Sequence, residues 1–443
     1  MLAVLKHQTY RRLFLAQVIA LTGTGLATVA LGLLAFEIAG ANAGAVLGTA
    51  MAIKMIAYIG VAPIVGAYAN RLPRRTFLIA MDLLRATVAL ALPFVDQVWQ
   101  IYVLIFLLQS ASAGFTPTFQ ATIPDVLPDE RDYTRALSLS RLAYDMESLL
   151  SPVLAAALLG IIGFHWLFAG TAVGFLASAL LVMATMLPAP VAEAPGAGVW
   201  RRTTRGARIY LSTPRLRGLL AVTLAAAAAS AMVIVNTPVL VLGALKLGQS
   251  QVALTIAAFG GGSMAAALLL PKLLDRLPDR TVMLVSAVAM TGVLAVLALL
   301  WPVQPDPGDW PLVLTGWLLL GASYAASITP GGRLLRRSSG AADRPALFAA
   351  QFALSHVCWL VAYPLAGQLG ATFGMSVALG GAAALALLGT IVAMVLWPAT
   401  DPDIVEHHHD DLPADHPHLQ EGHGDGRASH TYVIDEIHPR WPG

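Results

Sequence analysis

Apolar residues along the chain form long runs that are separated by short breaks rich in charge, proline or glycine. Each run spans roughly 20 residues or more, and a helix that rises about 1.5 Å per residue then crosses about 30 Å of hydrocarbon. We therefore predict an all-α membrane protein with twelve transmembrane helices. The predicted spans lie near residues 13–38, 44–68, 77–95, 99–121, 136–159, 165–187, 217–243, 251–273, 282–302, 311–330, 346–369 and 375–398.

A short basic turn in the first half of the chain returns in the second half. Residues 71–76 read RLPRRT and residues 276–281 read RLPDRT, each between two apolar runs. A Thr-Pro pair likewise ends the fourth run and the tenth run, at 116–117 and 329–330. These repeats predict two pseudo-symmetric halves of six helices that arose by duplication. Among membrane proteins this architecture points first to secondary transporters, in which the substrate path lies between the halves.

Two polar stretches complete the predicted organisation. Residues 1–187 form the N-terminal half and 217–398 the C-terminal half, with a basic cytoplasmic linker at 188–216 and a His/Asp-rich cytoplasmic tail at 399–443. In the linker, arginines alternate with apolar residues such as Tyr210. This pattern favours either an amphipathic stretch that lies against anionic headgroups or a linker whose charge only keeps it in the cytoplasm.

The composition excludes a soluble protein. The chain is 57% hydrophobic and 12% charged, with a mean hydropathy of +0.71, whereas a soluble globular protein is about 25% charged. The one cysteine, Cys358, excludes a disulfide within the chain.

The basic residues indicate the orientation in the membrane. If both termini are cytoplasmic, only Lys246 of the 27 basic residues lies outside, and only Lys54, Arg85 and Arg141 lie within spans. This asymmetry satisfies the positive-inside rule. We therefore expect a multi-pass protein of the inner (plasma) membrane with both termini in the cytoplasm.

Two motifs carry a resemblance to a known family. The first comprises a glycine and the charged residues of the repeated turns: Gly66, Arg71, Arg74, Arg75, Asp275, Arg276 and Arg280. The second follows the fourth span: Pro117, Gln120, Ala121, Pro124, Asp125, Pro128, Glu130 and residues 136–138. The chain resembles the major facilitator superfamily and, within it, the macrolide-efflux-like branch of drug, siderophore and nickel exporters. It departs from the usual turn at Asn70, where the family carries an aspartate.

The arginines of the repeated turns cannot easily cross a bilayer, so they anchor each turn on one side of the membrane. We also consider a gating role, in which they pair with acids at neighbouring helix ends in one transport state only. The candidate acids are Asp125, Asp129 and Glu130.

Five polar residues within the spans are candidates for substrate binding or coupling: Lys54, Arg141, Asp145, Glu147 and His356. A charge at the bilayer centre costs about 2.5–3.5 kcal/mol, so each should have a partner or face water. Arg141 and Asp145 are four residues apart and can pair, which leaves Glu147 for Lys54 or a substrate. The resemblance implies that spans 2, 5, 8 and 11 meet between the halves, which would bring Lys54 near His356. The alternative is a purely structural set of ion pairs.

The tail holds most of the histidines of the chain, among many carboxylates. Imidazole and carboxylate groups suit nickel, cobalt, zinc or copper. The candidate ligands are His407, His408, His409, His416, His418 and His423. No fixed ligand spacing is present, so a solvated tail with incidental histidines is the alternative. We expect no required cofactor, and any binding of nickel, cobalt or zinc to be confined to the tail.

The sequence contains no glycine-lysine nucleotide loop, no His-Glu-x-x-His and no Gly-x-Ser-x-Gly, so we do not expect an enzyme. Our first hypothesis is a proton-coupled secondary exporter of a toxic small molecule that works by alternating access. Its partners are then the substrate, protons and the lipid bilayer, without nucleic acid, and the protein is a monomer. One alternative is a nickel or cobalt exporter served by the tail. Another is a membrane receptor or scaffold that does not transport.

Overall fold

The computed structural model describes residues 2–39, 43–68, 72–188, 200, 203–401, 404–408, 427–435, 437, 438 and 441. Within them, the first half consists of two short 3-10 turns and six long helices. The turns are η1 (Leu2–Lys6) and η3 (Leu92–Phe94). The helices are α1 (Gln8–Ala39), α2 (Ala43–Tyr68), α3 (Arg74–Ala91), α4 (Val98–Val126), α5 (Glu130–Leu159) and α6 (His165–Met183).

The second half contains six further long helices, and shorter elements connect them. The long helices are α9 (Pro214–Pro238), α10 (Gln249–Leu274), α11 (Asp279–Leu300), α12 (Trp310–Ile328), α14 (Arg344–Phe373) and α15 (Met375–Leu396). The shorter elements are α8 (Arg205–Ser212), the π-helical turn η4 (Val239–Ala244), η5 (Pro307–Asp309) and α13 (Gly331–Arg337). The tail contributes an antiparallel pair of strands, β1 (Ile404–His408) and β2 (Arg427–Thr431).

Eleven helices in the described part of the chain are long and apolar enough to cross a membrane. The remaining long helix, α5, has 30 residues, but its sequence carries several charged residues, among them Arg141, Asp145 and Glu147. Each of the twelve long helices overlaps one span predicted from the apolar runs. The prediction of an all-α membrane fold with twelve helices is confirmed.

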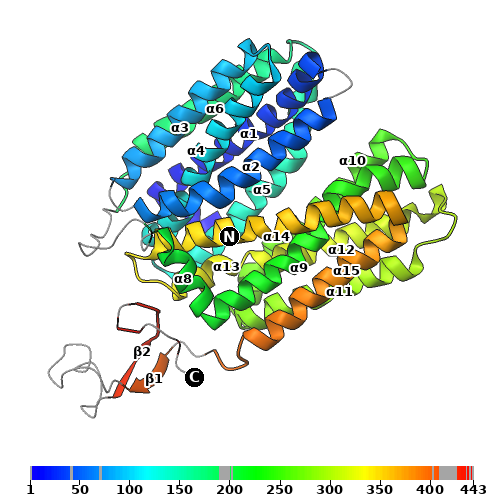
Figure 1. Ribbon diagram of the computed structural model, residues 1–443. Helices are drawn as coiled ribbons and strands as arrows, with labels where there is room; N and C mark the ends of the chain where they lie inside the picture. The colour runs from blue at the N-terminus through cyan, green and yellow to red at the C-terminus, as the bar shows by residue number, and fades with distance from the viewer. Residues whose placement is uncertain are drawn as a thin grey trace.

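The two halves are separate bundles that meet mainly along two helix pairs, and α4 also contacts α14. Figure 1 shows the blue and cyan helices as one bundle and the green to orange helices as the other, with axes that diverge away from α8 and α13. Helix α2 packs on α14, and α5 packs on α10. These helices correspond to spans 2, 11, 5 and 8, so the expected junction is present. The end of the molecule that carries Arg74, Arg280 and Arg336 is called the basic end below.

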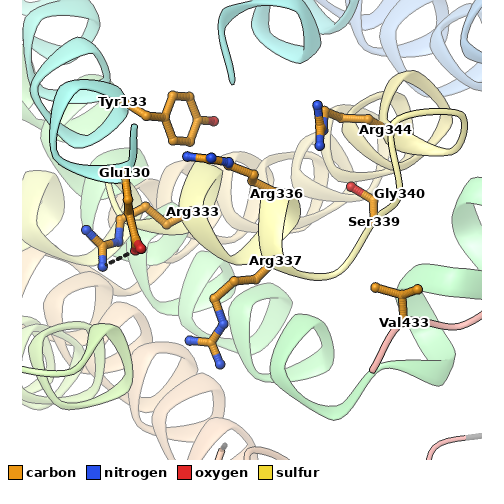
Figure 2. A pocket seen from close by; sticks show the side chains of 9 residues that line it. All are labelled: Glu130, Tyr133, Arg333, Arg336, Arg337, Ser339, Gly340, Arg344 and Val433. Carbon is orange, nitrogen blue, oxygen red and sulfur yellow. Dashed lines mark ion pairs between the residues drawn. The ribbon is translucent and has the colours of Figure 1, made fainter. Parts of the chain in front are cut away.

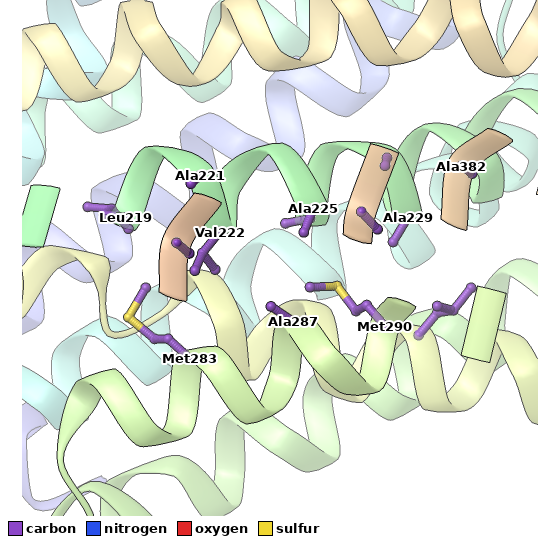
Figure 3. Close-up of a cluster of buried hydrophobic side chains, with 14 of the residues drawn as sticks. Leu219, Ala221, Val222, Ala225, Ala229, Met283, Ala287, Met290 and Ala382 are labelled. Carbon is purple, nitrogen blue, oxygen red and sulfur yellow. The ribbon is translucent and has the colours of Figure 1, made fainter. Parts of the chain in front are cut away.

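The core of the second half is built around α9, which includes an alanine run at residues 225–229. Small side chains let neighbouring helices approach α9 closely. Figure 3 shows Val222 and Ala229 on the side of α9 that faces Met283 and Met290 of α11. A Cβ added at Gly389 of α15 would lie 2.6 Å from the carbonyl oxygen of Ala221, so α15 requires glycine at this contact.

The linker helix α8 packs on protein. Ile209 and Tyr210 are buried, and the Tyr210 hydroxyl donates a hydrogen bond to Gln351 of α14. Of the two alternatives that the sequence left open, contact of these apolar residues with headgroups does not hold for Ile209 and Tyr210, which cover α14 because that helix offers both an apolar surface and a polar acceptor. Trp200 and Leu211 remain exposed.

The end of the tail also contacts the basic end. Tyr432 and Ile434 are buried in the core of the second half, and the Trp441 ring lies 4.9 Å from the Arg215 guanidinium. Asp401, where the tail begins, pairs with the same arginine at 3.2 Å. The first and last segments of the tail are therefore part of the folded structure.

The packing of α10 on α12 generates a stability prediction. A Cβ at Gly262 would overlap the carbonyl group of Leu318, whereas a Cβ at Gly261 meets no atom within 4 Å. We expect Gly262→Ala to lower the free energy of unfolding by about 1–3 kcal/mol, the usual cost of overpacking, and Gly261→Ala to preserve it. Melting temperatures of the purified variants in detergent measure the effect. Equal melting temperatures would contradict the described packing.

Candidate functional site

A cluster of aromatic and basic side chains lies where α2 meets α14. The Nζ atom of Lys54 lies 5.4 Å from the centre of the Tyr58 ring. The Tyr58 ring contacts the rings of Phe352 and His356 at centroid distances of 4.8 and 4.6 Å. The Nδ1 atom of His356 lies 2.6 Å from the Phe352 carbonyl oxygen, which fixes the imidazole. Lys54 and His356, which come from opposite halves, thus meet around one tyrosine ring.

Glu147 of α5 belongs to the same region. Its carboxylate and the Lys54 ammonium interact electrostatically, and a Cβ added at Gly25 of α1 would lie 3.1 Å from the Glu147 Oε1 atom. Among the residues that the structure describes, none donates a hydrogen bond to this carboxylate. A carboxyl group with a cation nearby but no fixed donor can change its protonation state without breaking a hydrogen bond.

Asp145 is held differently, although it lies only two residues before Glu147. Arg141 forms an ion pair with Asp145 along α5, as predicted from their spacing. Ser263 of α10 donates its hydroxyl to Asp145 Oδ2 at 2.6 Å. The Arg141 guanidinium also lies 4.8 Å from the centre of the Tyr324 ring in α12. The ion pair therefore joins the first half to two helices of the second half.

Ion pairs also connect the two halves at the basic end. Asp125 of α4 accepts hydrogen bonds from Arg74 of α3 and from Arg344 of α14. Glu130, the first residue of α5, pairs with Arg333 of α13 at 2.6 Å. Two of the three acids that the sequence suggested as gating partners thus bind arginines of the opposite half.

Further hydrogen bonds join α5 to α13 next to these ion pairs. The Tyr133 hydroxyl donates to the Gly332 carbonyl oxygen at 3.2 Å, and Arg333 donates to the Thr134 hydroxyl at 2.6 Å. Arg336 donates to the carbonyl oxygen of Pro128. The basic end is therefore closed by contacts between the halves.

Other residues of the repeated turns contribute to this closure or lie outside it. A Cβ at Gly66 of α2 would overlap the Cβ of Ala349, so α2 and α14 approach closely there. Asp275 lies 3.7 Å from Arg131 of the first half, and both side chains are largely exposed.

The remaining described candidates make contacts within one half or face outward. Arg280 donates two hydrogen bonds to the Trp397 carbonyl oxygen, at 3.1 and 3.2 Å. Arg75 and Arg276 are exposed. Asp129, which was considered as a gating partner, caps the start of α5 by accepting a hydrogen bond from the backbone of Asp132 at 2.9 Å.

Several candidates lie outside the described residues: Arg71, His409, His416, His418 and His423. For His407 and His408, the structure describes the backbone within β1. Among the described residues, no group of three or more His, Cys, Asp or Glu side chains is arranged to hold a metal ion.

Three arginines of the closed end were not among the candidates predicted from the sequence: Arg333, Arg336 and Arg344. The segment after the fourth span, residues 125–132, is mainly acidic, whereas the segment after the tenth, residues 333–344, is mainly basic. Duplicated halves place equivalent segments opposite each other, so this difference in charge was a usable signal.

Two helical bundles with a polar cluster between them, closed at one end by ion pairs, define a membrane transporter built from two halves. The sequence model of the Major Facilitator Superfamily matches residues 13–303 and 219–415. The chain belongs to this superfamily.

Individual relatives are distant. The uncharacterized MFS-type transporter YfiS of Bacillus subtilis (strain 168) is 26% identical over 120 residues, which cover 27% of this chain and 28% of that protein. The human organic anion transporter MFSD10 (TETRAN) has a TM-score of 0.74 at 12% identity, over 87% of this chain and 98% of that chain. A bacterial homologue of the iron transporter ferroportin, in an outward-facing state, has a TM-score of 0.73 at 16% identity, over 88% and 99%. Such identities show a common fold.

Closure of the basic end generates a second prediction. We expect Gly66→Leu to separate the halves there, because the new side chain would displace α14, whereas Gly60 of the same helix faces open space and Gly60→Leu should have no effect. Spin labels at Arg75→Cys and Leu277→Cys, in a Cys358→Ser background, report the distance between the halves. The distance distribution should lengthen in the Gly66 variant alone; identical distributions in both variants would argue against this contact as part of the closure.

Proposed function

We propose that the protein is a proton-coupled secondary exporter of a toxic small molecule, located in the inner membrane with both termini in the cytoplasm. The observation that carries this proposal is Glu147, a carboxylate of α5 with Lys54 of α2 nearby and no hydrogen-bond donor among the described residues. The distribution of basic residues supports the orientation, because it assigns the basic end to the cytoplasmic side. The described conformation is then closed toward the cytoplasm and accepts protons from outside.

Coupling would follow from the charge pair. Protonation of Glu147 from the outer side cancels its attraction to Lys54, so the contacts of α5 and α2 at the centre of the molecule can rearrange. Release of the proton into the cytoplasm restores the attraction. Substrate leaves through the reverse change of conformation, and each step shifts the balance between the two conformations by its own binding free energy.

The two acids of α5 have different parts in this scheme. Asp145 already satisfies Arg141 and Ser263, so its loss would leave a partly buried guanidinium without its counter-charge. Glu147 has no such hydrogen-bonded partner among the described residues. We therefore assign proton coupling to Glu147 and the joining of the halves to Asp145.

The aromatic side chains around Lys54 support a ring-containing, largely apolar substrate. His356 contacts Tyr58 and Phe352, and its ring also lies 5.9 Å from that of Trp359. Ring faces bind flat apolar molecules by stacking and by removing their surface from water.

Exchange of the two carboxylates for amides tests this assignment in proteoliposomes. In Glu147→Gln we expect the rate of transport driven by a pH gradient to fall at least about tenfold. Counterflow should continue, because it requires no net proton movement. Asp145→Asn should instead lower the melting temperature, because it weakens contacts between the halves. Glu37→Gln, at a side chain that is 55% exposed, serves as the matched control.

Two results would reject the assignment. If Glu147→Gln transports at the wild-type rate under a pH gradient, the coupling acid is another residue or the driving ion is not a proton. If the wild-type protein shows no counterflow with any drug-like compound or metal tested, it is not a transporter of these substrates. That result would support the alternative of a receptor or scaffold.

A nickel or cobalt exporter is the second candidate. The observation that favours it is the pairing of β1 with β2, because the strands bring together the two ends of the histidine-rich segment 409–426. A loop closed in this way needs less ordering to enclose a metal ion than a free tail does.

Replacement of residues 409–426 by a short glycine-serine linker distinguishes the two functions. This change keeps the pairing strands and the docked residues Tyr432 and Trp441, so we expect an unchanged melting temperature. Calorimetry should show loss of nickel and cobalt binding, while export of the organic substrate continues. Cells that become sensitive to nickel or cobalt, with unchanged drug tolerance, would instead place the metal exporter first.

A further inference from the structure

A cavity of about 300 Å³ lies at the basic end, between α5 of the first half and α13 of the second. Its wall includes Tyr133, Arg336, Arg344 and, from the tail, Val433. Figure 2 shows the Arg336 side chain directed toward Tyr133, whereas that of Arg337 is directed away from it. Both halves and the tail thus surround the same space.

Several of the arginine side chains that line this cavity have a buried N–H group that lacks a hydrogen-bond acceptor in the described part of the chain. Nη1 of Arg336 and Nε of Arg344 are among these groups. In the described part of the chain, Arg336 contacts the Pro128 carbonyl oxygen and the face of the Tyr133 ring, at 5.5 Å from its centre, and pairs with no carboxylate. A buried donor without an acceptor costs about 1–3 kcal/mol, and more when it is charged.

The charge around the cavity is unbalanced in the same direction. Asp125 is shared between Arg74 and Arg344, so one carboxylate faces two guanidinium groups. Asp401 is likewise shared between Arg215 and Arg337. The described surroundings therefore carry more positive than negative charge.

One carboxylate, that of Glu130, belongs to the cavity wall. It is held by Arg333 at 2.6 Å, as the dashed line in Figure 2 marks, and is thus turned to a partner other than Arg336. The guanidinium charge of Arg336 is thus left without a carboxylate partner in the described chain, and it can attract a ligand of opposite charge.

We propose that this cavity binds a phosphate-bearing anion and that the bound anion stabilises the closed basic end. The guanidinium fork matches the oxygen geometry of phosphate and forms short, charge-assisted hydrogen bonds to it. A volume of about 300 Å³ accommodates a phosphate group with a small organic substituent. The cavity is lined by residues at the ends of helices, and neither Lys54 nor Glu147 belongs to its wall. This inference therefore does not depend on the proposed transport function.

Stabilisation of closure follows from where the walls come from. The cavity exists while α5 contacts α13 through Tyr133 and Gly332, because one side of it belongs to each half. A ligand that binds the closed form better than the open form shifts the equilibrium toward the closed form. The anion would also reduce the repulsion between Arg336 and Arg344.

Inorganic phosphate is the first probe, added to the purified protein in a neutral detergent at constant ionic strength so that screening stays fixed. The reporter is Gly340→Cys in a Cys358→Ser background, because Gly340 lines the cavity and a Cβ there meets no atom within 4 Å. We expect phosphate to slow maleimide labelling of this cysteine and to raise the melting temperature, both in a saturable manner.

Variants decide whether the effect belongs to this cavity. Arg336→Gln should weaken phosphate binding about tenfold or more, whereas Arg75→Gln, at an exposed arginine of the same end, should not. Arg336→Lys keeps the charge and should show intermediate binding if Arg336→Gln fails to fold.

The source of the phosphate is a separate question. If the cysteine at position 340 is protected in nanodiscs that contain phosphatidylglycerol but not by free phosphate, and this protection is lost in Arg336→Gln, the result would support the site and assign the phosphate to a lipid headgroup. Absence of protection from both sources, or equal protection in the Arg336 and Arg75 variants, would overturn the proposal.

Discussion

The attraction between acids of the first half and arginines of the second half is the interaction on which the described conformation depends. Asp125 and Glu130 hold Arg344 and Arg333 at the one end where the bundles are tied by several ion pairs in the described chain. Removal of one partner from a partly buried ion pair of this kind destabilises the protein, because it leaves the other charge uncompensated. The bundles are therefore joined at the basic end, and their axes diverge toward the other end (Figure 1).

Within this frame, neighbouring charges at the centre of the molecule have unequal freedom. Arg141, Asp145 and Ser263 satisfy one another across the junction. Lys54 and Glu147 interact at longer range, beside the rings of Tyr58 and His356. A protein that must hold its halves in register and still respond to a proton or a substrate needs both kinds of site. The first is fixed by hydrogen bonds, and the second is left open to change.

The sequence predicted the helices well because a membrane span is a one-dimensional property of length and apolarity. It also indicated the pairing of Arg141 with Asp145, since four residues make one helical turn. It could not identify Tyr58 or Ser263 as partners, because contacts between distant helices depend on their rotation and tilt. The sequence left the placement of Ile209 and Tyr210 open for the same reason: an apolar face does not reveal whether lipid or protein will cover it.

The acidic segment 125–132 and the basic segment 333–344 occupy equivalent positions in the two halves, yet they carry opposite charge. Two identical halves related by a twofold axis would bring acid against acid at this contact. The present halves are complementary because they differ, so neither could replace the other. A chain assembled from two copies of the first half would repel itself where the natural chain is tied together. The opposite charges of the two segments thus make the contact an obligatory pairing of unlike parts, although the predicted repeat makes the halves similar in fold.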